Sequence, residues 1–317
     1  MTDSWTAAKI PSQTGKLALV TGANSGVGFH AARHLALAGA TVLLTGRDPA
    51  RVEAARQRIL AERATAEVHA LPLDLASFAS IRHAVEQFYA GGSTAQLDLL
   101  INNAGVMALP ERRLTEDGFE MQIGTNHLGH FLLTGLLLPA LLAAPAARIV
   151  TVSSIAHKRA QLSLDDLNAI RAYQPRGAYA QSKLANLLFG LELDRRLRAS
   201  GARARSIVVH PGVSNTNIVK AGMGVDALQA RIAGVVFSFV AQSDDQGSLP
   251  TLYGATAPTA EGGHYYGPDG FLEVRGYPRE VQPTAQAKDP VLAEKLWKLS
   301  EGLTGMHYDF TASALSS

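Results

Sequence analysis

The most constraining feature of the sequence is a regular alternation of short apolar runs with helical patterns. Runs rich in Val, Leu and Ile predict strands over 17–20, 41–45, 68–71, 97–101, 148–152 and 205–209. Helical patterns lie between them, over 29–38, 49–63, 77–89, 116–144 and 179–197. Strands that are apolar throughout are typical of a parallel sheet covered on both faces. Right-handed crossovers make such a sheet doubly wound, so we predict an α/β Rossmann fold.

The alternation weakens after Pro211. We expect a single domain over 1–317, in which 213–283 forms a small C-terminal substrate lid and appendage near the strand ends. Residues 258–283 are rich in Gly, Pro and Tyr. The apolar run over 232–240 predicts either a lid for a lipophilic substrate or a plain core helix.

Charge and composition narrow the choice of partners. The 317 residues carry a net charge of only +2, which gives no case for a nucleic-acid partner. The chain has no cysteine, which excludes disulfides, thiolate metal sites and a Cys nucleophile. The most apolar run, 131–144, is shorter than the roughly 20 residues of a spanning helix and contains Pro139. We therefore expect a cytoplasmic protein with no membrane span.

A glycine-rich segment joins the first predicted strand to the first predicted helix. Its glycines follow a Gly-x3-Gly-x-Gly spacing, which permits a tight turn and lets backbone N–H groups approach a pyrophosphate at the helix N-terminus. The alternative is an ordinary strand–helix turn. The candidate cofactor-binding residues of this segment are Gly22, Asn24, Ser25, Gly26, Val27 and Gly28.

The end of the second predicted strand indicates which dinucleotide binds. An acidic residue at this point binds the ribose of NAD, whereas an Arg accommodates the 2′-phosphate of NADP. Here Gly46 occupies the acidic position and Arg47 follows, so a guanidinium is available to a phosphate. Asp48 adjoins Arg47. We expect NADP(H) to be preferred, with NAD(H) as a second cofactor.

Tyr179 and Lys183 are four residues apart in a predicted helix, so both lie on one face. A nearby ammonium and an oxidised nicotinamide both favour the Tyr phenolate. Lowering the pKa of Tyr179 by about three units corresponds to roughly 4 kcal/mol. Ser153 and Ser154 follow a predicted strand, where a hydroxyl can donate to a substrate oxygen or can cap the strand end.

These segments together resemble the short-chain dehydrogenase/reductase family over about residues 15–216. The sequences of 126–131 (Asn-His-Leu-Gly-His-Phe) and 178–186 (Ala-Tyr-Ala-Gln-Ser-Lys-Leu-Ala-Asn) resemble its retinol-dehydrogenase-like branch. The resemblance implies hydride transfer between a nicotinamide and a carbonyl or alcohol carbon of a small molecule. It assigns proton exchange to Tyr179, ribose binding and pKa lowering to Lys183, and substrate orientation to Ser154.

The resemblance also assigns roles to other loops at the strand ends. It implies adenine contacts for Asp74 and Leu75, although Asp74 could simply cap a helix. It implies that Asn103, Ala104 and Gly105 line the adenine ribose, in a segment that could otherwise be a polar turn. The remaining expected cofactor residues, which would meet the nicotinamide carboxamide and the phosphates, are Pro211, Gly212, Val213 and Thr216.

Asn126 is expected in a helix kink, where the family uses an Asn to hold a water that relays protons to the Lys. His127 and His130 have the spacing of helix-packing residues, and we expect no metal site because no carboxylate or Cys accompanies them. The polar segment over 162–176 lengthens the interval between Ser154 and Tyr179 and is expected to shape the pocket rim.

Other functions compete with this interpretation. An NADP-binding regulatory or scaffold protein without turnover would have the same fold, but the intact Tyr179, Lys183 and Ser154 argue against it. The glycine spacing argues against a sugar-nucleotide epimerase. A nucleic-acid module would need aromatic residues among its Arg cluster, and none is present over 195–205. A homodimer through the helices at 131–144 and 179–197 remains open, as does a monomer.

Overall fold

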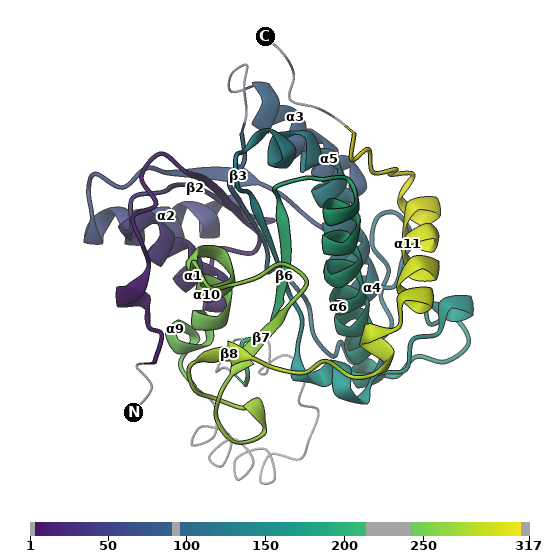
Figure 1. Cartoon of the computed structure of the whole chain (residues 1–317). Coiled ribbons are helices and arrows are strands. Elements are labelled where there is room, and N and C mark those ends of the chain that lie inside the picture. Colours follow the sequence, from purple (N-terminus) through teal and green to yellow (C-terminus); the bar gives the residue numbers. More distant parts are fainter. Residues whose placement is uncertain (1–3, 91–95, 214–241, 312–317) are drawn as a thin grey trace, which may run out of the picture.

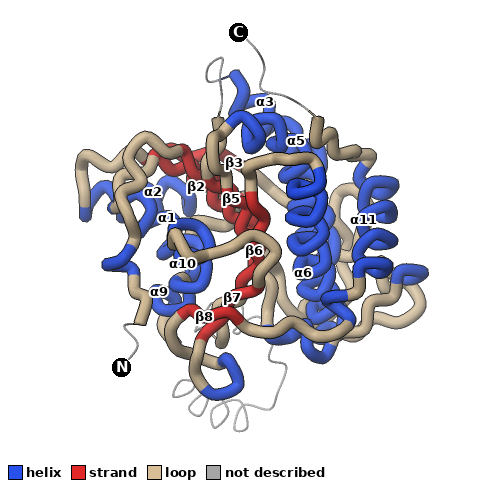
Figure 2. Tube along the Cα trace, in the orientation of Figure 1, coloured by secondary structure: helices blue, strands red, loops and turns tan. Residues whose placement is uncertain are grey.

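The computed structural model describes residues 4–90, 96–213 and 242–311. Within them the chain forms one eight-stranded sheet with the order β3-β2-β1-β4-β5-β6-β7-β8 (Figures 1 and 2). The strands are β1 Leu17–Val20, β2 Thr41–Gly46, β3 Val68–Pro72, β4 Leu99–Asn102, β5 Arg148–Val152, β6 Arg205–Val209, β7 Tyr265–Pro268 and β8 Pro278–Glu280. All neighbouring pairs are parallel except β7 and β8. The predicted doubly wound α/β fold is confirmed.

Helices cover both faces of the sheet. The α-helices are α1 Gly26–Leu37, α2 Pro49–Glu62, α3 Phe78–Ala90, α4 Met121–Ile123, α5 Gly129–Ala143, α6 Pro175–Ala199, α9 Asp244–Gly247, α10 Leu249–Thr256 and α11 Pro290–Thr304. Helices α1, α2 and α10 pack on one face, and α3, α5 and α6 pack on the other (Figure 1). The sheet is therefore the middle layer of three.

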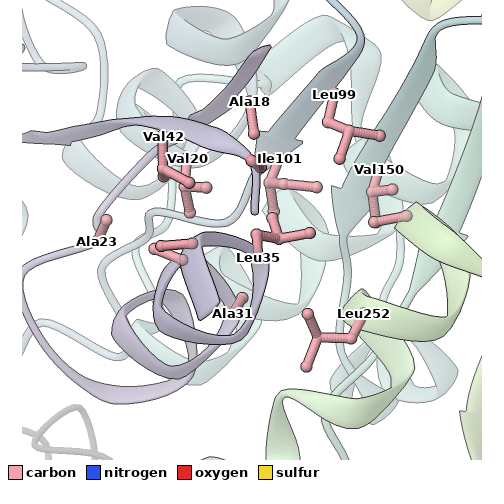
Figure 3. Packing of buried hydrophobic residues seen from close by; sticks show 14 of the residues in the cluster. Ala18, Val20, Ala23, Ala31, Leu35, Val42, Leu99, Ile101, Val150 and Leu252 are labelled. Carbon is pink, nitrogen blue, oxygen red and sulfur yellow. The ribbon is translucent and has the colours of Figure 1, made fainter. Parts of the chain in front are cut away.

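The alternation of side chains along each strand explains why both faces need cover. Ala18 and Val20 of β1 point into the core beneath α1, whereas Leu19 between them points into the core beneath α5. Figure 3 shows the first of these cores, where Leu35 of α1 and Leu252 of α10 approach the strands. Because both sides of β1 are apolar, neither face could be left in water.

The strands β7 and β8 were not predicted. They lie within the segment 213–283 that the sequence suggested as a lid and appendage, of which 214–241, including the apolar run 232–240, lies outside the described residues. Tyr265 and Tyr266 of β7 pair with β6, and Leu252 of α10 is 1% exposed. Most of the described part of this segment therefore completes the sheet and its core.

A single helical stretch runs from α4 through a π-helical segment, η2 Gly124–Leu128, into α5. It begins at Met121, five residues later than predicted, and Pro139 lies inside α5 without ending it. By length and composition this stretch could cross a membrane, but 78% of its most apolar window is buried inside the protein. The stretch therefore has the surroundings of a core helix.

Helix α11 packs against one side of α5 and α6, the two helices through which the sequence left a homodimer open. Trp297 lies at the centre of this contact, with ring centroids 5.1 Å from Phe131, 5.8 Å from Phe189 and 4.6 Å from Tyr308. In Figure 1 α11 runs alongside α6. A dimer through these faces would have to displace α11, and the homodimer stays a prediction.

His127 of the π-helical segment lies in the same core and generates a testable prediction. Its Nε2 lies 2.9 Å from the Ser300 hydroxyl of α11, and burial lowers its pKa to about 3. Because the unfolded chain takes up a proton near pH 6.5, this lowered pKa contributes stability above that pH. The contribution is lost as pH falls from about 6.5 towards 3.

We expect the His127→Gln variant to lose less stability on acidification than the wild type, by about 2 kcal/mol between pH 7 and pH 5. Urea unfolding at the two pH values measures this difference. His83→Gln, at an exposed position on α3, is the matched control and should behave like the wild type. An equal loss of stability in wild type and His127→Gln would contradict the account.

Candidate active site

The chain contains a cavity of about 1330 Å³ at the carboxyl ends of the parallel strands. Predicted site residues reach its wall from the ends of β1 to β6, and five of these strands supply the residues that anchor the two ends of the site. These residues are Gly22 after β1, Arg47 after β2, Asn103 after β4, Ser154 after β5 and Pro211 after β6. The carboxyl edge of an open parallel sheet is where such folds bind ligands. Pockets for drug-sized ligands measure roughly 300–1,000 Å³, so there is room for a dinucleotide and a substrate.

The glycine-rich segment forms one end of the cavity. Gly22 and Gly26 have left-handed φ angles of 65° and 62°, which favour glycine. A Cβ on Gly28 would lie 2.3 Å from Asn103 Nδ2, so the segment packs directly on the loop after β4. Ser25 makes no side-chain cap to α1, which leaves the backbone N–H groups of the first helical turn to an anion. All six predicted residues of the segment line the cavity.

A buried hydrogen-bond chain connects this segment to the π-helical segment. Thr21 Oγ1 accepts the backbone N–H groups of Asn103 at 2.8 Å and Ala104 at 2.9 Å. Its hydroxyl meets His130 Nε2 at 2.9 Å, and His130 Nδ1 meets the Asn126 carbonyl at 2.9 Å. Since a carbonyl only accepts, the His130 proton is on Nδ1 and Thr21 donates to Nε2.

Burial lowers the pKa of His130 to about 4, which keeps the ring neutral and this hydrogen-bond chain intact at neutral pH. The sequence suggested only helix packing for this residue. The sequence could indicate only the local contact with Asn126, four residues earlier. The contact with Thr21 could not be predicted, because the two residues are 109 positions apart. His130 therefore fixes the loop after β4 relative to the end of β1.

Asn126 lies in the π-helical segment, which interrupts the regular α-helical hydrogen bonding between α4 and α5. Its Oδ1 accepts the Val106 N–H at 2.8 Å, and its Nδ2 donates to the Val106 carbonyl and to Ser182 Oγ, both at 2.9 Å. The side chain thus anchors the loop after β4 to α6. The water relay through Asn126 stays a prediction.

Three predicted catalytic side chains converge on the opposite part of the cavity. Lys183 Nζ lies 5.9 Å from the centre of the Tyr179 ring and donates to the Val152 carbonyl at 3.0 Å. Lys183 is 4% exposed, and this burial lowers its pKa to about 8. Burial raises the pKa of Tyr179, and a hydrogen bond with the Ser154 hydroxyl opposes that rise.

The two neighbouring serines have different surroundings. Ser153 borders the cavity but is buried, and its Oγ donates to the Lys183 carbonyl at 2.7 Å. Ser154 faces the cavity, bonds to Tyr179 and also accepts the Ala156 N–H at 3.2 Å. Both interpretations of Ser154, as a substrate-orienting hydroxyl and as a cap, fit this geometry.

The β2 end of the cavity carries two guanidinium groups. Arg47 lines the cavity as predicted, and Arg51 of the first turn of α2 lines it as well. Neither forms an ion pair within the part of the chain that the structure describes. Asp48 Oδ1 accepts the N–H groups of Ala50 at 3.0 Å and Arg51 at 3.2 Å, so this carboxylate caps α2. Arg51 was missed because its helical pattern gave no reason to assign it to the cavity.

The loop after β6 closes the cavity. Pro211, Gly212 and Val213 line it as predicted, whereas Thr216 lies outside the described residues. Leu272 and Val274, from the connection between β7 and β8, also line it and were not predicted. No local motif predicts that these two apolar residues line the cavity, because the sequence around them is typical of turns.

The other predicted contacts fall as follows. Asp74 and Leu75 line the cavity, and Asp74 Oδ1 also accepts the Ala76 N–H at 2.9 Å. Ala104 and Gly105 line it beside Asn103. Among residues 4–90, 96–213 and 242–311, no group of three or more His, Asp or Glu side chains is placed to hold a metal ion.

Comparisons with known proteins agree with this geometry. A family model described as short chain dehydrogenase matches residues 16–223. The chain is 42% identical over 303 residues to polyprenol dehydrogenase from Mus musculus, a match that covers 93% of this chain and 86% of that one. It is 40% identical over 296 residues to retinol dehydrogenase 13 from Homo sapiens, which covers 92% and 85%.

A solved structure is also similar. An uncharacterized protein from Mycobacterium Paratuberculosis is 41% identical and superposes with a TM-score of 0.79, covering 97% of this chain and all of that one. The similarity therefore extends well past residue 223, through β7, β8 and α11.

Proposed function

Because the chain belongs to the short-chain dehydrogenase family of oxidoreductases, in its retinol-dehydrogenase-like branch, we propose that it is an NADP(H)-dependent enzyme acting on a carbonyl or alcohol. The observation that carries the proposal is the joining of two features in one cavity. The glycine-rich segment for a dinucleotide lies at one end, and Tyr179, Lys183 and Ser154 lie at the other.

The residues of the cavity suit a nicotinamide dinucleotide. A side chain at Gly22 or Gly28 would collide with the loop after β4, so these glycines let the glycine-rich segment pack on that loop. The backbone of the segment then lines the cavity, where its N–H groups could bind a pyrophosphate. The bound cofactor would carry the hydride, and the protein would orient the cofactor and substrate and set the electrostatic environment around them. Pro211, Gly212 and Val213 would meet the nicotinamide, while Lys183 would meet its ribose.

The protein's own chemistry is proton exchange at the substrate oxygen. Ser154 donates a hydrogen bond to that oxygen and orients it towards the Tyr179 hydroxyl. In the direction of carbonyl reduction, Tyr179 releases its proton to the oxygen as the oxygen gains negative charge. Lys183 stabilises the resulting phenolate, because an ammonium nearby favours the charged form of Tyr179.

Arg47 and Arg51 support a preference for NADP(H). Both residues line the cavity at the end of β2, where a 2′-phosphate would bind. Asp48, the acidic neighbour that could favour NAD(H), instead caps α2. The positive charge at this end is therefore available to a phosphate.

The substrate end supports a lipophilic carbonyl or alcohol. The cavity wall includes the apolar residues Met107, Leu109, Ile155, Leu272 and Val274, together with the cationic residues Lys158, Arg159 and Arg176. An apolar wall with a few convergent polar groups selects an apolar body that carries one reacting oxygen. Two relatives carry the names of isoprenoid-type alcohols, polyprenol and retinol, in keeping with such a substrate.

We expect Tyr179→Phe to lower kcat for reduction of decanal with NADPH by about 10²- to 10⁴-fold, the usual contribution of general acid–base catalysis. NADPH affinity should stay within about twofold, because the phenol is not needed to place the dinucleotide. Loss of NADPH absorbance measures turnover, with Tyr89→Phe on α3 as the control. Turnover retained in Tyr179→Phe would contradict the assignment of proton exchange to Tyr179. If the wild type binds NADPH but reduces none of a panel of carbonyls, the interpretation as a scaffold protein without turnover is favoured.

Arg47→Ala should weaken NADPH binding by at least about tenfold, equivalent to about 1.4 kcal/mol, and should leave NADH binding nearly unchanged. The physical reason is loss of the guanidinium that faces the 2′-phosphate position. Fluorescence transfer from tryptophan to bound cofactor measures both affinities. Arg82→Ala, an exposed Arg on α3, is the matched control, and equal weakening of both cofactors would refute the preference.

A further inference from the structure

The connection between β7 and β8 forms one edge of the substrate end of the cavity. We call residues 270–276 the β7–β8 segment. It contributes Leu272 and Val274 to the cavity wall. It also contains a carboxylate, Glu273, which takes no part in the proposed proton exchange at Tyr179.

The backbone of this segment is strained. Leu272 has a φ of 52° and Glu273 a φ of 58°, and neither is glycine. Two consecutive left-handed residues with side chains are unfavourable, and they persist only where surrounding contacts hold them. The conformation leaves Leu272 69% exposed at the cavity rim and turns Glu273 inward, with 15% of its side chain exposed.

Glu273 makes two contacts that bridge two walls of the site. Its Oε1 accepts the Lys158 ammonium at 2.7 Å, from the 3₁₀ helix Ile155–Arg159 that follows Ser154. Its Oε2 lies 3.1 Å from His210 Nε2, at the start of the loop after β6. His210 is fully buried, and its Nδ1 accepts the Gly212 N–H, so its Nε2 carries the proton. This N–H lies close to the carboxylate in an electrostatic contact that lacks the alignment of a hydrogen bond.

Backbone contacts hold the same segment against the loop after β6. The Val213 N–H donates to the Val274 carbonyl at 2.8 Å. A Cβ on Gly212 would lie 2.3 Å from that carbonyl, so the two chains touch. Gln242 joins them a third time, since its Nε2 donates to the Pro211 carbonyl at 2.6 Å and its Oε1 accepts the Gly276 N–H at 3.2 Å.

We propose that Glu273 is a positioning residue that holds the β7–β8 segment against the loop after β6, and that Leu272 thereby contacts the apolar body of the substrate. The segment is then a determinant of chain-length specificity, and the inference rests on the proposed function. The backbone is strained, and the contacts of Glu273 add to the uncharged hydrogen bonds that hold this segment against the cavity.

Glu273→Gln tests the tether, because it keeps the size of the side chain and removes its charge. Amide hydrogen exchange within 270–276 should accelerate by about tenfold or more as local opening becomes easier. With NADPH, KM for decanal should rise by about fivefold or more, while kcat and the KM for propanal stay within about twofold. Glu280→Gln on β8, whose carboxylate contacts His264 at 3.0 Å, is the matched control and should leave exchange and both KM values unchanged.

Leu272→Gly separates the wall from the tether. Glycine tolerates the left-handed backbone, so exchange in 270–276 should stay at the wild-type rate or slow. The KM for decanal should nevertheless rise as in Glu273→Gln, because the apolar contact is gone. Should Glu273→Gln fold poorly, Lys158→Met removes one partner of the carboxylate at an exposed position and should give the Glu273→Gln pattern.

The outcomes separate this inference from the proposed function. Unchanged exchange in both Glu273→Gln and Lys158→Met would overturn the tether, and accelerated exchange with unchanged KM for decanal would overturn the role in specificity. If the wild type reduces no aldehyde, the proposed function fails and the role in specificity falls with it. Exchange then still decides whether Glu273 holds the segment.

Discussion

The site depends on two reciprocal hydrogen bonds between Lys183 and the end of β5. The Lys183 ammonium donates to the Val152 carbonyl, and the Lys183 carbonyl accepts from the Ser153 hydroxyl. These bonds fix α6 against the carboxyl edge of the sheet, which sets Tyr179 one helical turn away beside Ser154. The other loops of the cavity reach the same point because their strands run parallel to β5.

The position of Lys183 also sets the electrostatics. Burial of an ammonium is unfavourable unless it is paired, and no carboxylate pairs with this one in the part of the chain that the structure describes. Its pKa therefore falls to about 8, which still leaves it mostly protonated at neutral pH. Without cofactor, burial keeps the Tyr179 pKa high. The unpaired ammonium is thus available to stabilise a phenolate once a second positive charge enters the cavity.

Much of this arrangement could be predicted from the sequence, because it is encoded locally. The first six strands are apolar runs, the glycine spacing is contiguous, and Tyr179 and Lys183 share one turn of helix. What was missed depends on contacts between distant residues. The strand β7 is four residues long and ends in Gly267 and Pro268, which read as a turn. The role of Glu273 depends on Lys158, 115 positions away, and on His210. The role of α11 depends on the aromatic residues that it covers.

Helix α11 is a second case in which a local sequence pattern could not predict a contact between distant residues. An amphipathic helical pattern over 290–304 would identify a helix, but not the face it covers. The structure places its Trp297 over Phe131 and Phe189, on surfaces that the sequence left free for a partner subunit. A partner subunit could use these faces of α5 and α6 only if α11 moved, and the homodimer stays a prediction.

We propose that Tyr179 becomes a usable acid–base group only when Lys183 and an oxidised nicotinamide act on it together. It is tested most directly by a near-ultraviolet difference titration of tyrosine ionisation, wild type against Tyr179→Phe, with and without saturating NADP⁺. The account predicts one extra phenolate in the wild type that forms above pH 10 without NADP⁺ and at clearly lower pH with it. An extra phenolate whose titration does not move when NADP⁺ binds would contradict it.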